Sequence, residues 1–251
     1  MMKRRDRRQE ILDLLGQGEP LGIHMLADTL AVSDETVRRE LRLLEADGLI
    51  ERIHGGARLS KSVEEGPFEA RLHRNAAAKQ RIAAAVAQTV ADGESLYLDA
   101  SSTAFHIAQA LKGKRDLTIV TNALGVAAEL GGRHGNRLYL AGGELDERYR
   151  AFFDATARAY LAQFRPGVAI VSTESVSPDA GFTDYHVGEG ELCRQMIAQS
   201  RRVTMAVDAS KFDRASIVAV AAFADIDRIV TDRAIDPTYA VAGAGVEWIA
   251  A

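Results

Sequence analysis

The sequence is poor in the residues that build disulfides and metal sites. Cys193 is the only cysteine among 251 residues, so an intramolecular disulfide and a zinc-binding cysteine cluster are both excluded. No spacing of His, Asp and Glu indicates a metal site, and we expect no cofactor. A single thiol fits a reducing compartment, so we expect a cytoplasmic protein in which Cys193 is a buried packing residue.

Long apolar runs are also missing. No run is long enough to span a bilayer. The basic first eight residues are followed by the amphipathic stretch 9–13 and not by the apolar core of a signal peptide. We therefore expect a soluble protein that does not contact a membrane.

An excess of positive charge, which would indicate nucleic acid as a partner, is absent. The net charge is −4, and residues 1–60 hold ten Lys or Arg and eleven Asp or Glu, a net of −1. Any contact with DNA must therefore depend on where the basic residues lie and not on their number. Hydrophobic residues make up 47% of the chain, with charges interspersed, which favours packed cores over disorder.

The first sixty residues predict a compact helical unit with a hairpin. Apolar stripes indicate one helix around residues 11–15 and a short second helix over 23–30. A third helix begins at the N-cap Ser33 and ends near Asp47. Residues 49–59 then form two short strands around a Gly-Gly turn. Three helices and a hairpin are the parts of a winged helix-turn-helix.

The third helix can present basic residues to DNA. Val37, Leu41 and Leu44 recur at helical spacing and form its buried stripe, which leaves an arginine face outside. A helix fits the major groove, where arginine bonds guanine or clamps phosphate. The residues expected at DNA are Ser33, Asp34, Glu35, Thr36, Arg38, Arg39 and Arg42 on the helix, and Arg52, His54 and Arg58 on the hairpin.

A basic helical face does not by itself establish DNA binding. Such a face is usually only solvated, and surface ion pairs between Glu35 and Arg39 or between Arg42 and Glu45 are an alternative. The combination of a short helix, a tight turn, a serine cap, a basic helix and a Gly-Gly hairpin favours DNA binding instead.

The rest of the chain predicts a second domain. We expect a DNA-binding domain over 1–59, a polar linker over 60–67 and a second domain over 68–251, which starts with one helix over 68–90. Short apolar runs then alternate with helical patterns, which favours an α/β domain with a largely parallel sheet. The expected strands are 95–98, 117–120, 138–141, 168–171, 203–207, 217–220 and 228–231, and the expected helices are 103–111, 123–130, 155–163 and 189–200.

Polar loops follow several of these strands, at the edge where open α/β sheets bind ligands. Hydroxyl residues at a helix N-terminus suit a phosphate, and a lysine adds a cation. Each loop alone is more often only a cap or a turn, but several in one domain favour a binding site. The expected effector-binding residues are Asp99, Ser101, Ser102, Thr103, Thr121, Asn122, Gly142, Gly143, Glu144, Asp208 and Lys211.

Both halves resemble the DeoR family of bacterial transcription regulators. Residues 33–41 are S-D-E-T-V-R-R-E-L and residues 52–57 are R-I-H-G-G-A, similar to the family signatures S-x-x-T-[IV]-R-R-[DE]-L and R-x-H-G-G-A. The resemblance implies DNA-binding roles for Thr36, Arg38 and Arg39. The stretches that resemble the family's sensor domain are 99–103, 120–123, 142–144 and 208–212.

What this resemblance implies is a repressor with an N-terminal winged helix-turn-helix and a C-terminal α/β sensor domain similar to ribose-5-phosphate isomerase. The sensor domain would bind a phosphorylated metabolite. Residues 163–165, 184–186 and 208–212 with Arg214 are most similar to the family members that control glycerol 3-phosphate regulons, so glycerol 3-phosphate is the favoured effector.

Three stretches depart from the family pattern. Ser101 stands where glycine is usual, and residues 151–154 replace a stretch that contains glycine. Glu174 follows a strand without the usual glycine, and its charge would disfavour a second anionic group on the ligand.

Three functions are compatible with these observations. The favoured one is a ligand-controlled repressor, a homodimer or homotetramer that binds double-stranded operator DNA at half-sites one helical turn or a multiple apart. A phosphosugar isomerase with an appended DNA-binding module is the second, motivated by Asp99, Asp208 and Lys211, although no separate motif supplies a catalytic base. The third is a constitutive DNA-binding oligomer without an effector, which the departures at Ser101 and Asp154 leave possible.

Overall fold

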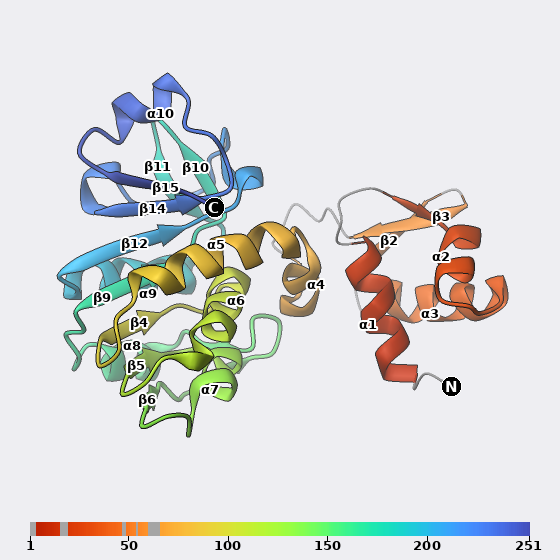
Figure 1. Ribbon diagram of the computed structural model, residues 1–251, viewed down its shortest axis with the longest axis horizontal. Helices are drawn as coiled ribbons and strands as arrows, with labels where there is room; N and C mark the ends of the chain where they lie inside the picture. Colours follow the sequence, from red (N-terminus) through yellow and green to blue (C-terminus); the bar gives the residue numbers. More distant parts are fainter. Residues whose placement is uncertain (1–3, 16–19, 47–48, 54, 60–65) are drawn as a thin grey trace. The chain divides into compact units, whose positions relative to one another are not determined.

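The computed structural model divides into two compact units, Met1–Ala77 and Ala78–Ala251, and each is described here by itself (Figure 1). The expected domain limits at residues 59 and 68 stay a prediction, because residues 60–65 lie outside the described part. Within the ranges described, no helix is long and apolar enough to cross a membrane. The structure describes residues 4–15, 20–46, 49–53, 55–59 and 66–251.

The first unit has the predicted helices and hairpin. Its three short strands form an antiparallel sheet in the order β1-β3-β2, in which β2 and β3 are the expected hairpin. β1 is only two residues long and has no periodic pattern, so it could not be predicted. The elements are α1 (Arg4–Leu15), β1 (Leu21–Gly22), α2 (Ile23–Thr29), α3 (Asp34–Ala46), β2 (Ile50–Ile53), β3 (Gly56–Leu59) and α4 (Phe68–His73).

A small apolar core holds α3 in place. Val37, Leu41 and Leu44 are buried, as their helical spacing predicts, in a cluster that includes Ile11 of α1 and Leu26 of α2. Because this stripe faces the core, the opposite face of α3 is exposed to solvent.

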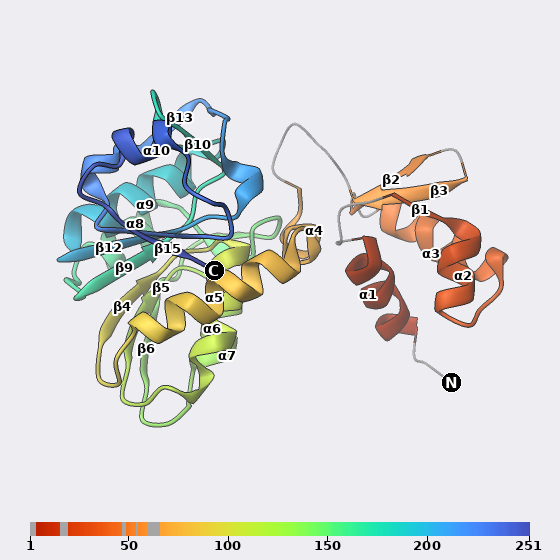
Figure 2. The same ribbon diagram turned by 45° about the horizontal axis from the view of Figure 1, so that its top comes forward.

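The second unit is built on a seven-stranded sheet in the order β15-β14-β12-β9-β4-β5-β6 (Figures 1 and 2). Every neighbouring pair in it is parallel, which confirms the predicted parallel sheet. Its strands are β4 (Ser95–Leu98), β5 (Thr118–Thr121), β6 (Arg137–Leu140), β9 (Val168–Val171), β12 (Arg202–Ala206), β14 (Arg228–Thr231) and β15 (Glu247–Ala250).

Helices and two small antiparallel sheets complete this unit. The strand order of the larger one is β10-β11-β13, and β7 pairs with β8. The helices are α5 (Ala76–Thr89), which begins just before the division between the units, α6 (Ser102–Ala110), α7 (Leu124–Leu130), α8 (Ala155–Leu161), α9 (Val187–Gln199) and α10 (Pro237–Ala242). The short strands are β7 (Leu145–Asp146), β8 (Ala151–Phe152), β10 (Ser175–Ser177), β11 (Gly181–Asp184) and β13 (Val218–Ala221), and the 3₁₀ turns are Leu111–Gly113, Ala209–Lys211 and Phe223–Asp225.

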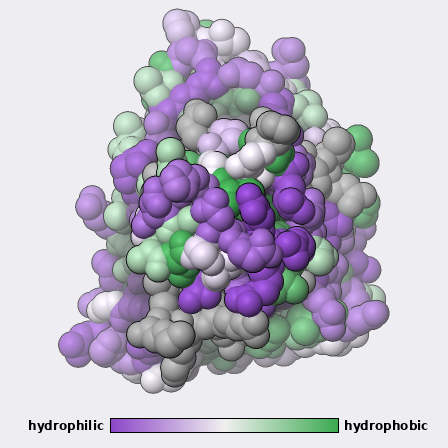
Figure 3. All heavy atoms as spheres, turned by 90° about the vertical axis from the view of Figure 1, so that its right-hand side faces the viewer, coloured by the Kyte–Doolittle hydropathy of each residue, from purple (hydrophilic) through white to green (hydrophobic). Residues whose placement is uncertain are grey.

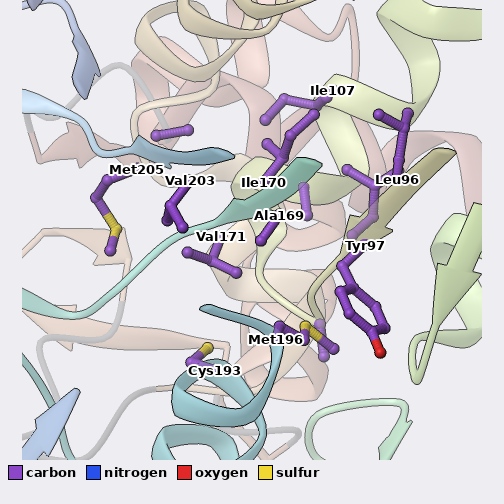
Figure 4. Close-up of a cluster of buried hydrophobic side chains, with 14 of the residues drawn as sticks. Leu96, Tyr97, Ile107, Ala169, Ile170, Val171, Cys193, Met196, Val203 and Met205 are labelled. Atoms are coloured by element: carbon purple, nitrogen blue, oxygen red, sulfur yellow. The ribbon is translucent and has the colours of Figure 1, made fainter. Parts of the chain in front are cut away.

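Both faces of the parallel sheet are covered. Figure 4 shows Ile107 of α6 on one side of β9, and Cys193 and Met196 of α9 on the other. All three side chains are buried, as is the whole of β9. A strand covered on both faces needs apolar residues at every position, which explains why its sequence is a continuous apolar run and not an alternating one.

Two predictions about the second domain need correction. Residues 68–90 do not form one helix: α4 ends at His73 and α5 begins at Ala76, because Asn75 adopts a left-handed conformation with φ of 55°. The expected strand 217–220 exists as β13, but it belongs to the antiparallel sheet. Its partner β11, the next strand β10, the pair β7 and β8, β15 and α10 are short and were missed. The other expected elements are present with ends shifted by a few residues.

Truncation of a buried side chain of the parallel sheet should lower the free energy of unfolding more than truncation of an exposed side chain. Ile229 of β14 is completely buried, so Ile229→Ala should lower the free energy of unfolding of the second unit by about 2–5 kcal/mol. Trp248 of β15, the only tryptophan, lies beside Ile229 in the sheet and reports urea unfolding by fluorescence. Ile217, 86% exposed, is the matched control, and Ile217→Ala should change that free energy by less than about 0.5 kcal/mol. Equal effects of the two changes would contradict this packing.

Candidate DNA interface and effector site

The arginines of α3 lie at the surface. The side chains of Arg38, Arg39 and Arg42 are 47%, 47% and 56% exposed. Glu35 lies 3.9 Å from Arg38 and 3.3 Å from Arg42, so the pairs differ from the two considered from the sequence, Glu35–Arg39 and Arg42–Glu45. Because exposed pairs of this kind contribute little in water, a DNA phosphate can compete for these guanidinium groups.

The start of α3 is capped as predicted. The Oγ of Ser33 accepts a hydrogen bond of 3.3 Å from the backbone N–H of Thr36, and the two hydroxyl groups lie 3.0 Å apart. Asp34 and Glu35 occupy the first turn and face the positive end of the helix dipole. Hydrophilic residues gather in the middle of the face that Figure 3 shows. The first turn of α3 therefore offers carboxylate acceptors beside arginine donors.

The hairpin adds two more arginines. Arg52 lies 3.8 Å from Glu45, and Arg58 lies 2.7 Å from Glu51 on the facing strand. Gly56 pairs with β1 so closely that a Cβ there would collide with the carbonyl of Leu21, which explains the second glycine of the Gly-Gly turn. The third predicted hairpin residue, His54, lies outside the described residues.

One residue of α3 that was not expected from the sequence is a buried carboxylate. Glu40 is fully buried, and its oxygens accept hydrogen bonds from the Nε of Arg8 at 3.0 Å and from the Nη2 of Arg39 at 3.3 Å. Arg7 lies 3.9 Å away. The helical stripe of α3 could have indicated burial at this position, because Glu40 adjoins Leu41 and follows Val37 by three residues.

In the second unit, the predicted effector residues lie at the ends of four strands, β4, β5, β6 and β12. Together with β9, which lies between β12 and β4, these strands are neighbours in the sheet. The chain moves outward from β4 to β5 and β6 on one side, and from β9 to β12 on the other. Ligands of open α/β sheets bind at the carboxyl ends of the strands where the direction of winding reverses. The site is therefore expected next to the ends of β4 and β9.

Asp99 joins these two strands at their ends. Its buried carboxylate accepts hydrogen bonds from the backbone N–H of Ser172 at 2.7 Å and from the hydroxyl of Ser101 at 2.7 Å. The same Ser101 hydroxyl accepts from the backbone N–H of Ala104 at 2.9 Å and caps α6. Ser101, where the family usually has glycine, thus has a structural role as the cap of α6.

Lys79 is a site residue that the sequence analysis missed. Its buried Nζ donates a hydrogen bond of 2.9 Å to the Oγ of Ser102, the first residue of α6, and Thr103 beside it is also buried. An ammonium group at the N-terminus of a nine-residue helix is an arrangement that favours anions. Lys79 lies on α5, far from any recognisable motif, so only the fold brings it here.

The loop after β5 supplies a polar atom that lacks a partner. Thr121 is buried and accepts a hydrogen bond of 3.1 Å from the backbone N–H of Ala123. The side-chain nitrogen of Asn122 donates to the carbonyl of Phe152 at 3.0 Å. The buried Oδ1 of Asn122 has no hydrogen-bond partner among the described residues. Such an acceptor is costly to leave unsatisfied, so it can accept a hydrogen bond from a ligand.

Asp154 holds the glycine loop after β6. Its carboxylate accepts from the backbone N–H of Ala157, capping α8 at 2.9 Å, and from that of Glu144 at 3.0 Å. These two bonds, first that of Ala157, lower the pKa of Asp154. A Cβ on Gly143, whose φ is 138°, would collide with this carboxylate. Gly142, Gly143 and Glu144 are exposed, so the loop forms a rim and is not a buried part of the site.

Lys211, the cation expected to bind phosphate, is already paired with Glu174. Lys211 forms a short ion pair with the buried Glu174, and Arg214 lies 3.8 Å from the same carboxylate. Burial alone would raise the pKa of Asp208, but the charges of Lys211 and Lys79 and hydrogen bonds from Ser210 outweigh it and lower that pKa. The positive charges of Lys79 and Lys211 therefore both act on Asp208.

Cys193 is buried, as expected, and lies 3.9 Å from Asp99. Burial, and then the negative charge of Asp99, raises the pKa of the thiol far above its ordinary range. The thiol therefore stays protonated and packs under the sheet (Figure 4). No cluster of metal-binding side chains occurs within the described ranges.

The first unit is a winged helix with an exposed basic helix, and the second is an α/β unit with polar groups at its strand ends. These two features together define a ligand-sensing transcription regulator. Residues 7–63 match the DeoR-like helix-turn-helix domain, and residues 74–233 match the DeoR C terminal sensor domain. The chain belongs to the DeoR family. This membership confirms the predicted winged helix-turn-helix with an α/β sensor domain, and it favours a regulator over the isomerase.

Curated relatives align with nearly the whole chain. The transcriptional repressor AccR of Agrobacterium fabrum is 35% identical over 90% of this chain and 89% of its own length. The glycerol-3-phosphate regulon repressor of Escherichia coli is 33% identical over 92% of both chains. Among solved structures, ribose 5-phosphate isomerase from Plasmodium falciparum is 13% identical over 53% of this chain and 52% of its own, with a TM-score of 0.39. The two curated relatives are regulators and not enzymes.

Asp208 predicts how the stability of the second unit depends on pH. Because its pKa in the folded state lies below the ordinary value of 3.8, ionised Asp208 stabilises the fold above pH 3.8. This contribution is lost as the pH falls from 3.8 through the lowered pKa. In Asp208→Asn, the urea midpoint followed by Trp248 fluorescence should therefore fall less steeply below about pH 4 than in the wild type. The exposed Asp179 is the control, and an Asp208→Asn profile parallel to the wild type would refute this assignment.

Proposed function

We propose that this chain is a transcriptional repressor that releases its operator when a phosphorylated metabolite binds the second unit. The observation that supports it most directly is the buried Lys79 beside Ser102 at the N-terminus of α6. Membership of the family supports the DNA-binding and sensing roles. The ammonium group of Lys79 supports the binding of a phosphate.

The phosphate is proposed to bind between Lys79, Ser102, Thr103 and the N-terminus of α6. An ammonium group gives a charge-assisted hydrogen bond to a phosphate oxygen, and the first N–H groups of a helix add to it. Ser101 takes part through its backbone, because its hydroxyl is committed to Asp99 and to the cap.

Hydroxyl groups of the effector are proposed to bind on either side of the phosphate. The buried Oδ1 of Asn122 and the buried carboxylate of Asp208 are proposed to accept hydrogen bonds from these hydroxyl groups. Thr121 precedes Asn122, and Lys211 follows Asp208 by three residues. The buried Glu174 disfavours a second anionic group. Glycerol 3-phosphate, with one phosphate and two hydroxyl groups, fits this pattern, and a relative named for the glycerol-3-phosphate regulon supports it.

For DNA, we propose that α3 enters the major groove. Arg38, Arg39 and Arg42 contact bases or phosphates, and the first turn of α3, with Ser33, Asp34, Glu35 and Thr36, lies nearest the bases. Arg52, Arg58 and His54 of the hairpin are proposed to contact the backbone or the minor groove. A homodimer or homotetramer would place two such helices at paired half-sites.

A constitutive DNA-binding oligomer is the second candidate. The ion pair of Lys211 with Glu174 favours it, because a phosphate at Lys211 would have to displace that carboxylate. Calorimetry with phosphorylated three- to six-carbon metabolites separates the two candidates. Heat of binding with any of these compounds supports the sensor, and its absence with all of them supports the constitutive oligomer.

Lys79 gives a direct test of the effector site. A duplex selected by the wild-type chain from a random pool serves as operator, and glycerol 3-phosphate is the first of the metabolites titrated. In Lys79→Gln, the concentration needed for operator release should rise about tenfold or more, because a charge-assisted bond is lost. Operator affinity without metabolite should stay unchanged. Lys112→Gln, at a surface ion pair of the same unit, is the control. If none of the metabolites changes operator affinity in the wild type, the sensing role is wrong.

Arg38 tests the DNA interface in the same assay. Arg38→Ala should weaken binding to the selected duplex about tenfold or more, since one arginine contact in the major groove is lost. Arg133→Ala removes an exposed arginine from the second unit and should leave the affinity unchanged. Wild-type affinity after separate truncation of Arg38, Arg39 and Arg42 would exclude α3 as the recognition helix.

A further inference from the structure

We propose that Glu40 is a positioning residue for operator recognition. Its buried carboxylate fixes the guanidinium groups of Arg8 and Arg39, from two different helices, side by side at the surface of the first unit. The inference rests on the proposed function, because it takes α3 to be the helix that contacts DNA. Neither the family match nor the relatives' names assign a role to Glu40.

The geometry explains how one carboxylate can orient two arginines. Each of its oxygens accepts from a different helix, Oε2 from the Nε of Arg8 on α1 at 3.0 Å and Oε1 from the Nη2 of Arg39 on α3 at 3.3 Å. Arg7 lies 3.9 Å from Oε1. Glu40 has no exposed surface, whereas Arg8 and Arg39 are 36% and 47% exposed. The carboxylate is thus hidden behind the groups that it holds.

The charges around Glu40 leave a positive surface. Burial alone would raise the pKa of Glu40, but hydrogen bonds from Arg8 and then Arg39 outweigh it and lower the pKa below the ordinary value of 4.5. Glu40 is therefore ionised at neutral pH, one negative charge against the three positive charges of Arg7, Arg8 and Arg39. A guanidinium group has five N–H donors, so one bond to Glu40 leaves donors for a DNA phosphate or base.

A fixed arginine binds DNA at a smaller entropic cost than a mobile one. Holding a long side chain in place on binding costs conformational entropy, and Glu40 has already restricted two such side chains. Arg38 and Arg42 differ in this respect, because their shared partner Glu35 is 71% exposed. Of the two carboxylates, only that of Glu40 is buried.

A purely structural role for Glu40, as a link between α1 and α3, is the competing explanation. It predicts loss of stability on removal of the carboxylate, with equal loss of affinity for every DNA sequence. Positioning predicts a different result, because bases are distinguished only when donors meet them in a fixed geometry. The ratio of operator affinity to affinity for a scrambled duplex therefore separates the two roles.

The experiment compares Glu40→Gln with Asp28→Asn in the full chain. Asp28 of α2 is an exposed carboxylate of the same unit, 71% exposed, to which no DNA contact is assigned. The probes are the duplex selected by the wild type and a scrambled duplex of equal length. Both variants lose one negative charge, which by itself favours attraction to any DNA. We expect the affinity ratio to fall about tenfold or more in Glu40→Gln and to stay within about twofold in Asp28→Asn. An unchanged ratio in folded Glu40→Gln would overturn the inference.

Removal of one partner from a buried pair is strongly destabilising, so Glu40→Gln is checked by circular dichroism, and Arg8→Lys serves as a second variant. Lysine keeps the charge of Arg8 but has no Nε to bond Glu40 in the same geometry. We expect its affinity ratio to fall while the salt dependence of operator binding stays that of the wild type. A wild-type ratio in Arg8→Lys would overturn the inference if Glu40→Gln does not fold. If the wild-type chain prefers no duplex, the proposed function itself fails, which is a different outcome.

Discussion

The burial of one apolar stripe on α3 is the constraint on which the DNA-binding half depends. Val37, Leu41 and Leu44 must face the small core, and this fixes the rotation of the helix about its axis. The arginines are then exposed as a consequence, without an excess of positive charge in the unit. Because Glu40 lies at the margin of the same buried face, its carboxylate orients arginines from within the fold.

A comparable constraint shapes the sensor unit. Helices cover both faces of the parallel sheet, so polar groups collect where the strands end. Asp99 joins the ends of β4 and β9 through Ser172, and Asp232 accepts from the backbone N–H of Ala209 at 2.8 Å and from Arg81 of α5 at 3.0 Å. The helix that carries Lys79 is thus bonded to the loop after β12. The proposed phosphate site and this loop are therefore parts of one hydrogen-bonded framework.

Structural features that depend on residues close together in the sequence could be predicted from local patterns. The stripe of α3, the Ser33 cap, the hairpin and most strands of the sheet belong to this class. What was missed depends on residues distant in sequence: Lys79 meets Ser102 only through the fold, and the break at Asn75 has no periodic signal. Several predicted site residues proved to have structural bonds as well, since Ser101 caps a helix and Lys211 pairs with Glu174.

The central claim, that α3 binds DNA through its exposed arginines, is tested most directly by a structure of the full chain bound to its selected duplex. In this structure α3 should lie in the major groove, with Arg38, Arg39 and Arg42 within hydrogen-bond distance of bases or phosphates. Arg8 should lie beside Arg39 and contact the same DNA backbone. A complex in which α3 faces solvent, or in which another surface of the chain contacts the duplex, would contradict it.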